Sequence, residues 1–431
     1  MKIFTEPDKS IWEELFKRPT PEFAEIEDQV KPVFQEVAKK GDQAVQDYTR
    51  RFDGVDLQTF LCTPEELQEA EAAVPADLQK AIQQAKANIE RFHIAQRTGR
   101  IEVETAPGVL CWQEKKPIEK VGLYIPGGTA PLFSTILMLA IPAQIAGCGE
   151  VVLCTPPNKE GKVHPAILYT ASLCGLNQVF KVGGIQAVAA MTFGTETIPK
   201  VYKIFGPGNQ YVTVAKQLAT QFGVAIDMPA GPSEVMVVAD DSAKAPFVAA
   251  DLLSQAEHGS DSQVVLVSTS MDMLTQVQNE IGIQLKTLPR KEMAEKALSN
   301  SKLIYTPGMD TAVSMINYYG PEHLILSCTD AENVAGEVMN AGSVFLGNFT
   351  PESAGDYASG TNHTLPTNGY ARQYSGVNLD SFMKSITYQR ITEMGIQEIG
   401  QTVALMAEAE GLQAHKNAIT VRLKALENNK E

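Results

Sequence analysis

Several features that mark specialised classes of protein are missing from this 431-residue sequence. Its six cysteines form no C-x-x-C pair, which indicates reduced, mostly buried thiols rather than a paired-cysteine motif. Acidic residues outnumber basic ones, and the formal net charge of −15 makes nucleic acid an unfavourable partner. With 44% hydrophobic and 20% charged residues, the composition excludes a largely disordered or low-complexity chain.

Membrane and export signals are also missing. The N-terminal residues carry acids and contain no apolar run, which excludes a signal peptide. Residues 121–149 carry no formal charge, but Pro126, Pro131 and Pro142 interrupt them. Their uninterrupted helical stretch, 132–141, is about half the ~20 residues that a membrane span needs. We therefore expect a cytoplasmic protein with no membrane partner.

From residue 121 the sequence repeats a short apolar run, a glycine loop and a helical pattern. This βαβ alternation predicts a parallel sheet with helices on both faces, and ligands bind such sheets at the carboxyl ends of the strands. No loop reads G-x-G-x-x-G, so the standard dinucleotide fingerprint is absent, and tight turns without a ligand remain an alternative. The predicted strands are 121–125, 150–154, 179–182 and 201–205, and the predicted helices are 130–146, 185–193 and 210–220.

A second alternating stretch follows residue 234. Its predicted strands are 235–239, 263–267, 302–305, 323–327 and 343–346, and its predicted helices are 246–258, 271–286, 290–299, 309–319 and 330–341. Residues 347–370 form a long segment without periodicity, and loops of that length in compact proteins are functional or disordered. The chain is thus expected to be α/β, with two Rossmann-like parallel-sheet modules.

The two ends of the chain show other secondary-structure patterns. Residues 1–100 are mostly helical in pattern, residues 101–120 suggest an antiparallel strand pair, and the last sixty residues suggest helices. The expected domains are a helical segment (1–20), an α/β domain (21–120 plus 234–377), a second α/β domain (121–233) and a helical tail (378–431).

The most distinctive polar pattern is Gln255-x-x-His258, at the end of a predicted helix. Residues three apart leave a helix on nearly the same face, so an amide oxygen and an imidazole can address one divalent metal. Asp356, in the long segment, and His415, near the last helix, would complete a ligand set that suits zinc. Spacing alone favours the alternative of a dipole-stabilised His258 and a polar rim residue, because these positions span 160 residues.

Glu322-His323 is a second candidate pair. Histidine titrates near neutral pH and is suited to removing an alcohol proton, and a neighbouring carboxylate can activate water. Adjacent residues in a regular strand point to opposite faces, so both can serve one site only if Pro321 holds them in a turn. A surface Glu beside a core His is the alternative.

Long stretches of the sequence resemble the histidinol dehydrogenase family, in family order and over essentially the whole chain. They include VGLYIPGGTAPLFST, KIFGPGN, AIDMPAGPSEV, DLLSQAEHGSDSQV, YGPEHLI, PESAGDYASGTNHTLPT and AEGLQAHKNA. The resemblance implies a zinc- and NAD-dependent oxidoreductase that ends histidine biosynthesis by oxidising L-histidinol to L-histidine through the aldehyde, reducing two NAD+ per turnover.

The resemblance also implies roles for single residues. Glu322 and His323 match the catalytic pair, with His323 as base and Glu322 activating water. One zinc per subunit would be held by residues matching Gln255, His258, Asp356 and His415, NAD by those matching Tyr124, Gln186 and Asn209, and substrate by those matching Ser233, Gln255, His258, His323, Asp356, Glu410 and His415. By the same resemblance, the domain of residues 21–120 and 234–377 would carry the zinc and substrate site, and residues 121–233 would bind NAD. Family members are homodimers, and the dimer-forming tail (378–431) of one subunit would bring Glu410 and His415 to the other's site.

Two other functions could use the same residues. A zinc hydrolase would use Glu322 and water against an amide and would need no nicotinamide. A non-catalytic α/β binding protein would hold its histidines as structural residues.

Overall fold

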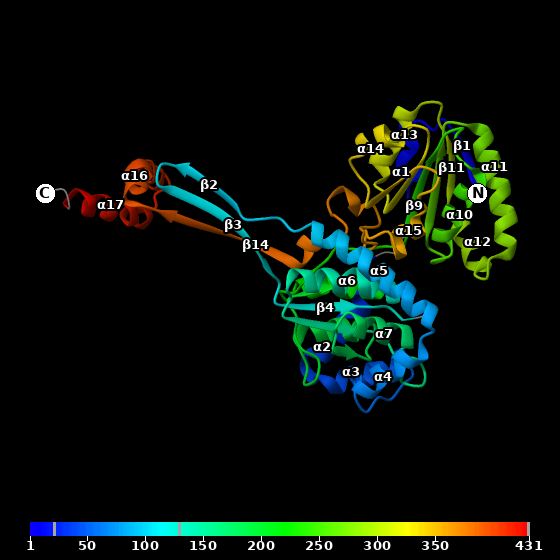
Figure 1. Ribbon diagram of the computed structural model, residues 1–431, viewed down its shortest axis with the longest axis horizontal. Helices are drawn as coiled ribbons and strands as arrows, with labels where there is room; N and C mark the ends of the chain where they lie inside the picture. Colours follow the sequence, from blue (N-terminus) through cyan, green and yellow to red (C-terminus); the bar gives the residue numbers. More distant parts are fainter. Residues whose placement is uncertain (20–22, 128–130, 429–431) are drawn as a thin grey trace. The chain divides into compact units, whose positions relative to one another are not determined.

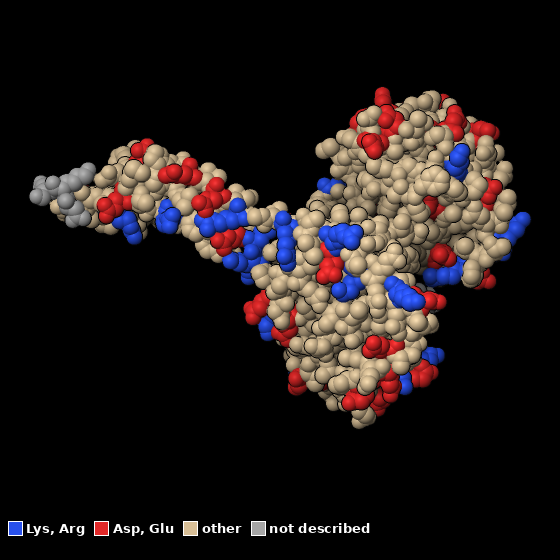
Figure 2. Space-filling model, viewed as in Figure 1, with Lys and Arg blue, Asp and Glu red and all other residues tan. Residues whose placement is uncertain are grey.

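The computed structural model describes residues 1–19, 23–127 and 131–428. These form two compact units, one of Met1–Gln96 and Ile118–Phe382, the other of Arg97–Pro117 and Met383–Glu431 (Figure 1). Acidic side chains are spread over both units with basic ones among them (Figure 2). In the described ranges, no helix has the length and apolar character needed to cross a membrane.

A six-stranded parallel sheet forms one half of the first unit, in the order β1-β11-β10-β9-β12-β13. Alternate residues of β9 face opposite sides of the sheet. Val235 and Val237 belong to the hydrophobic core between the sheet and α10, α11 and α12. Met236 and Val238 belong to the core on the other face, beneath α1, α13 and α14 (Figure 1). The elements are β1 (Lys2–Thr5), β9 (Glu234–Ala239), β10 (Gln263–Ser268), β11 (Lys302–Tyr305), β12 (His323–Ser327), β13 (Ser343–Leu346), α1 (Trp12–Leu15), α10 (Ala245–Ala256), α11 (Met271–Gln284), α12 (Lys291–Ser299), α13 (Met309–Tyr319), α14 (Ala331–Gly336) and α15 (Glu352–Tyr357).

A five-stranded parallel sheet, in the order β6-β5-β4-β7-β8, forms the other half. All three predicted strand–glycine–helix units are present, although residues 128–130 of the first loop lie outside the described ranges. The predicted α/β class with two parallel-sheet modules is confirmed. The elements are β4 (Lys120–Tyr124), β5 (Glu150–Cys154), β6 (Gln178–Phe180), β7 (Lys203–Phe205), β8 (Ala225–Ile226), α6 (Phe133–Ala146), α7 (Pro165–Leu173), α8 (Gly184–Phe193) and α9 (Gln210–Thr220).

The N-terminal helices differ from the expected grouping of residues 21–120 with 234–377. Helices α2 (Phe23–Lys40), α3 (Asp42–Phe52), α4 (Pro64–Ala73) and α5 (Ala76–Ala95) pack on α6 to α9, the helices of the five-stranded sheet. Val30, Phe34 and Val37 share a core with Val188 and Val212. The additional strand of the six-stranded sheet is β1 instead. Periodicity identifies the buried face of a helix, but not which surface covers it.

The second unit is an antiparallel sheet with two helices. The predicted antiparallel strand pair is confirmed as β2 (Ile101–Ala106) and β3 (Val109–Pro117). The two helices come from the C-terminal tail: α16 (Glu393–Ala409) and α17 (Gln413–Asn428) pack on each other. The expectation of a wholly helical tail is wrong at β14 (Met383–Ile391), which pairs with β3. Tyr388 stacks on Trp112 across the pair, with ring centroids 5.2 Å apart. Such cross-strand contacts stabilise a strand beyond its local propensity.

Candidate active site

One cavity of about 190 Å³ in the first unit brings together six of the predicted site residues: Ser233, Gln255, His258, Glu322, His323 and Asp356. On the six-stranded sheet it lies at the amino ends of β9 and β12, and on the five-stranded side it reaches Gly206 and Gly208, after the carboxyl end of β7. The rule that ligands bind at carboxyl ends of strands therefore describes only one side of this cavity.

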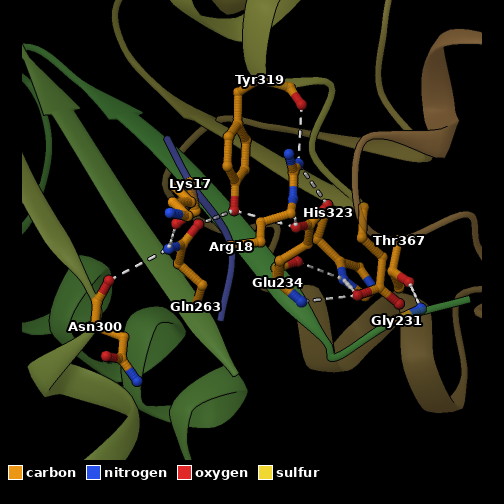
Figure 3. A network of polar contacts seen from close by, with 10 residues as sticks. Lys17, Arg18, Gly231, Glu234, Gln263, Asn300, Tyr319, His323 and Thr367 are labelled. Atoms are coloured by element: carbon orange, nitrogen blue, oxygen red, sulfur yellow. Dashed lines mark hydrogen bonds and ion pairs between the residues drawn. The ribbon is translucent and has the colours of Figure 1, made fainter. Parts of the chain in front are cut away.

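The imidazole of His323 is oriented by the backbone of β9. Its Nδ1 lies 3.4 Å from the carbonyl oxygen of Glu234 (Figure 3), a contact that favours the proton on Nδ1. Its Nε2 lies 3.5 Å from Asp356 Oδ1, too far for a strong hydrogen bond, and has no hydrogen-bond partner in the described part of the chain. A buried nitrogen without a strong hydrogen bond can exchange a proton with a ligand in the cavity.

Glu322 reaches the same cavity from the bend before β12. Because the strand begins only at His323, the two neighbours are not forced onto opposite faces, and both line the cavity. The Glu322 carboxylate accepts a hydrogen bond of 2.9 Å from the backbone N–H of Glu234. Burial raises the pKa of Glu322 to about 8. Its carboxyl group can therefore exchange a proton near neutral pH.

The three predicted metal ligands of the first unit approach from two helices. Gln255 is fully buried near the end of α10, whereas His258, just beyond that helix, is exposed, and Asp356 lies on α15. In the amide orientation that satisfies both neighbours, Gln255 donates to the carboxylate of Glu352, and its oxygen accepts from Glu234 N–H at 3.2 Å. The amide oxygen, the only part of Gln255 able to bind a cation, is thereby held away from Glu352.

The donor set and its electrostatics fit a divalent cation. Ligand atoms of His323, Glu352 and Asp356 all lie within 4.8 Å of one another. Burial raises the pKa of Glu352. Burial alone would lower the pKa of His323, but Glu352, Glu322 and Asp356 outweigh it and raise that pKa to about 10. Buried carboxylates that raise the pKa of a neighbouring imidazole this far form a negative site whose charge a cation would offset.

His363 fixes the segment that carries Asp356. Its Nδ1 lies 2.8 Å from the backbone oxygen of Asp356, and its Nε2 lies 3.1 Å from Thr135 Oγ1 at the start of α6. Since both ring nitrogens are engaged, His363 links the wall formed by the five-stranded half to the wall formed by α15.

The three predicted cofactor contacts lie at the carboxyl edge of the five-stranded sheet. Tyr124 ends β4, and its hydroxyl accepts from Gly184 N–H at 3.0 Å. Gln186, in the first turn of α8, donates to Asp53 at 3.3 Å, while its buried Oε1 has no partner among the described residues. Asn209 is exposed, and its side chain caps α9. None of the three predicted contacts lines the cavity described above.

A buried ion pair shapes the glycine loop after β7. Lys216 Nζ lies 2.5 Å from Asp227 Oδ1 and donates to Gly206 O at 2.7 Å, and Asp227 accepts from Gly206 N–H at 2.8 Å. Both side chains are at most 4% exposed. Both the N–H and the carbonyl oxygen of Gly206 are therefore fixed by this ion pair, which holds the glycine loop in place where it lines the cavity.

We expect Lys216→Met to lower the free energy of unfolding by about 3–5 kcal/mol, because it leaves the Asp227 carboxylate buried without its cation. Urea denaturation followed by circular dichroism measures this change. Lys80→Met is the matched control, since that side chain is 77% exposed and pairs with Asp77 at only 3.8 Å. Its loss should cost less than about 1 kcal/mol. Equal stabilities of the two variants would contradict the assigned role of Lys216.

The remaining predicted site residues, Glu410 and His415, belong to the second unit. Glu410 is the C-terminal capping residue of α16 and His415 lies in the first turn of α17, and both side chains are exposed. The first unit by itself thus assembles three of the four predicted metal ligands.

Two residues around the cavity were not predicted as site residues. Glu352 is 1% exposed and contacts Gln255, and Glu234 offers both its backbone groups to Glu322 and His323. Glu352 had a recognisable signal, because it precedes Asp356 by four positions, a spacing that places both carboxylates on one face of a helix. Glu234 had none, because it acts through its backbone.

Comparisons with known proteins agree with these features. A family model described as histidinol dehydrogenase matches residues 16–423. The chain is 59% identical over 426 residues to histidinol dehydrogenase of Bacteroides fragilis, covering 99% of this chain and 100% of that protein. It is 53% identical over 415 residues to that of Vibrio vulnificus, covering 96% and 95%. The crystal structure of histidinol dehydrogenase from Elizabethkingia anophelis superposes with a TM-score of 0.97 at 55% identity and 99% coverage of both chains.

Proposed function

Because the chain belongs to the histidinol dehydrogenase family of oxidoreductases, we propose that it oxidises L-histidinol to L-histidine through the aldehyde, as the last step of histidine biosynthesis in the cytoplasm. NAD+, when bound, would supply the hydride acceptor for each of the two steps. The observation that carries the proposal is His323, whose buried Nε2 has no hydrogen-bond partner among the described residues and which lines the same cavity as Glu322, Gln255 and Asp356.

We assign one zinc ion per subunit to Gln255, His258, Asp356 and His415. An amide oxygen, two imidazoles and a carboxylate form a donor set that zinc accepts. When bound, the cation anchors the imidazole and amine of the substrate and offsets the carboxylate field around His323. Gln255, His258 and Asp356 are also substrate contacts in this scheme, as are Ser233, His323, Glu410 and His415.

The proton chemistry belongs to His323 and Glu322. In the first step His323 Nε2 receives the proton of the substrate hydroxyl as hydride leaves the carbinol carbon. In the second step Glu322 removes a proton from the water that adds to the aldehyde, and the protonated His323 returns its proton to the aldehyde oxygen, which forms the hydrate and restores the base. His323 then receives a hydroxyl proton of the hydrate as the second hydride leaves. The hydrogen bonds of Glu234 to both residues keep them aligned throughout.

We assign NAD+ to the carboxyl edge of the five-stranded sheet, with contacts from Tyr124, Gln186 and Asn209. The buried, unpartnered Oε1 of Gln186 supports this assignment, because among the described residues it has hydrogen-bonding capacity left for a ligand. The protein acts as a homodimer, and Glu410 and His415 of the partner subunit complete each site.

Purified protein given L-histidinol and NAD+ should release two NADH per histidinol, measured by NADH absorbance and by histidine formed. Dialysis against EDTA should remove about one zinc per subunit and abolish turnover, and added zinc should restore both. A zinc hydrolase would produce no NADH under these conditions. A binding protein with structural histidines would contain no exchangeable metal.

A further inference from the structure

A buried ion pair between Arg18 and Glu234 lies beside His323 (Figure 3). Arg18, from the segment after α1, contacts the carboxylate of Glu234 through two nitrogens, with Nε at 2.5 Å and an η nitrogen at 3.0 Å. The Arg18 and Glu234 side chains are 13% and 2% exposed. This bidentate geometry fixes the direction of both side chains, which a single contact would not do.

Tyr319 holds the same pair from the end of α13. Its ring centroid lies 3.9 Å from the guanidinium carbon of Arg18, its backbone oxygen accepts from Arg18 at 2.9 Å, and its hydroxyl lies 3.2 Å from Glu234 Oε2. The guanidinium therefore has a carboxylate, a carbonyl and an aromatic face as fixed neighbours. The Glu234 side chain has little freedom to move.

The backbone of Glu234 connects this cluster to the site. Its N–H donates to the Glu322 carboxylate at 2.9 Å, and its carbonyl oxygen lies 3.4 Å from His323 Nδ1. One residue at the start of β9 thus faces Arg18 with its side chain and both catalytic residues with its main chain. Arg18 itself does not line the cavity.

We propose that Arg18 is a positioning residue for catalysis, acting through Glu234 on Glu322 and His323. Buried ion pairs contribute little net stability compared with apolar replacements of similar size, so a gain in fold stability does not by itself explain a charge at this position. The fork of Arg18 sets the position of Glu234, and the Glu234 backbone sets the two reacting side chains. This inference rests on the proposed function, because it assumes that His323 and Glu322 act on substrate.

Arg18→Lys keeps the charge but loses the bidentate fork. Because displacing a catalytic group by about 1 Å can cost on the order of 100-fold in rate, we expect kcat to fall at least about tenfold. KM for NAD+, zinc content and the melting temperature should change little. Tyr319→Phe removes one contact to the Glu234 carboxylate and should lower kcat by a smaller factor. This variant tests the proposal if Arg18→Lys does not fold.

Arg372→Met is the matched control. Arg372 lines the same surface pocket as Arg18 and lies 5.5 Å from the ring centroid of Tyr318. Arg18, and not Arg372, contacts the Glu234 carboxylate. The kcat of this variant should equal that of the unaltered protein. A loss of kcat in Arg372→Met as large as in Arg18→Lys would overturn the proposal, because it would show a general effect of the pocket.

A double-mutant cycle with His323→Asn separates positioning from a general loss of structure. If Arg18 acts through the catalytic pair, Arg18→Lys should lower the residual rate of His323→Asn much less than it lowers the normal rate. Equal fold losses in the two backgrounds, or a normal kcat in Arg18→Lys, would overturn the proposal. Failure of the proposed function is a different result, since the unaltered protein would then release no NADH from histidinol and NAD+.

Discussion

Replacing His323 with Asn is expected to lower kcat for both oxidation steps by about 10²- to 10⁴-fold, the usual contribution of a general base. The variant should keep its zinc, because His323 is not among the four assigned ligands, and its melting temperature should stay close to normal. Steady-state assays with histidinol and with histidinal as separate substrates measure the two steps. Metal analysis of the same preparations measures zinc.

The controls for this variant come from the same chain. His164→Asn alters a histidine whose Nδ1 accepts from Ala166 N–H at the start of α7, outside the cavity, and should leave both rates within about twofold. Glu322→Gln should slow the oxidation of histidinal more than that of histidinol, because only the second step needs activated water. Normal rates of His323→Asn with both substrates would exclude it as the base.

The sequence predicted most of the elements because their information is local. The i,i+3 spacing of Gln255 and His258 placed both residues at the end of one helix, and the structure has them in one cavity. Pro321 allowed Glu322 and His323 to share a site, and the strand does begin only at His323. The family resemblance supplied the assignment of roles, which spacing alone could not give.

What the sequence could not predict depends on contacts between distant segments. Arg18 and Glu234 are 216 positions apart, and no periodicity relates them. The same holds for β1, which joins β11 across the chain, and for β14, whose partner is β3. Glu352 is intermediate, because its spacing from Asp356 was visible but its contact with Gln255 required the packing of α15 beside α10.

The proposed contribution of the partner subunit predicts that two inactive variants restore each other. Asp356→Ala and His415→Asn should each lose zinc and nearly all activity as homodimers. In a co-expressed mixed dimer, one site receives both changes and the other receives none, because ligands from the two units then come from different chains. Random pairing in equal amounts makes half of the dimers mixed, so about one quarter of all sites should be active.

The arrangement of the ligands decides the outcome of this mixing experiment. Asp356 and His258 lie in the same unit, so Asp356→Ala mixed with His258→Asn should stay inactive: every site in that mixture lacks one ligand. If His415 instead served its own chain, the mixture of Asp356→Ala with His415→Asn would stay equally inactive. Activity and zinc content of mixed dimers purified through two different affinity tags therefore distinguish a shared site from a self-contained one. The homodimers alone cannot, because both arrangements make them inactive.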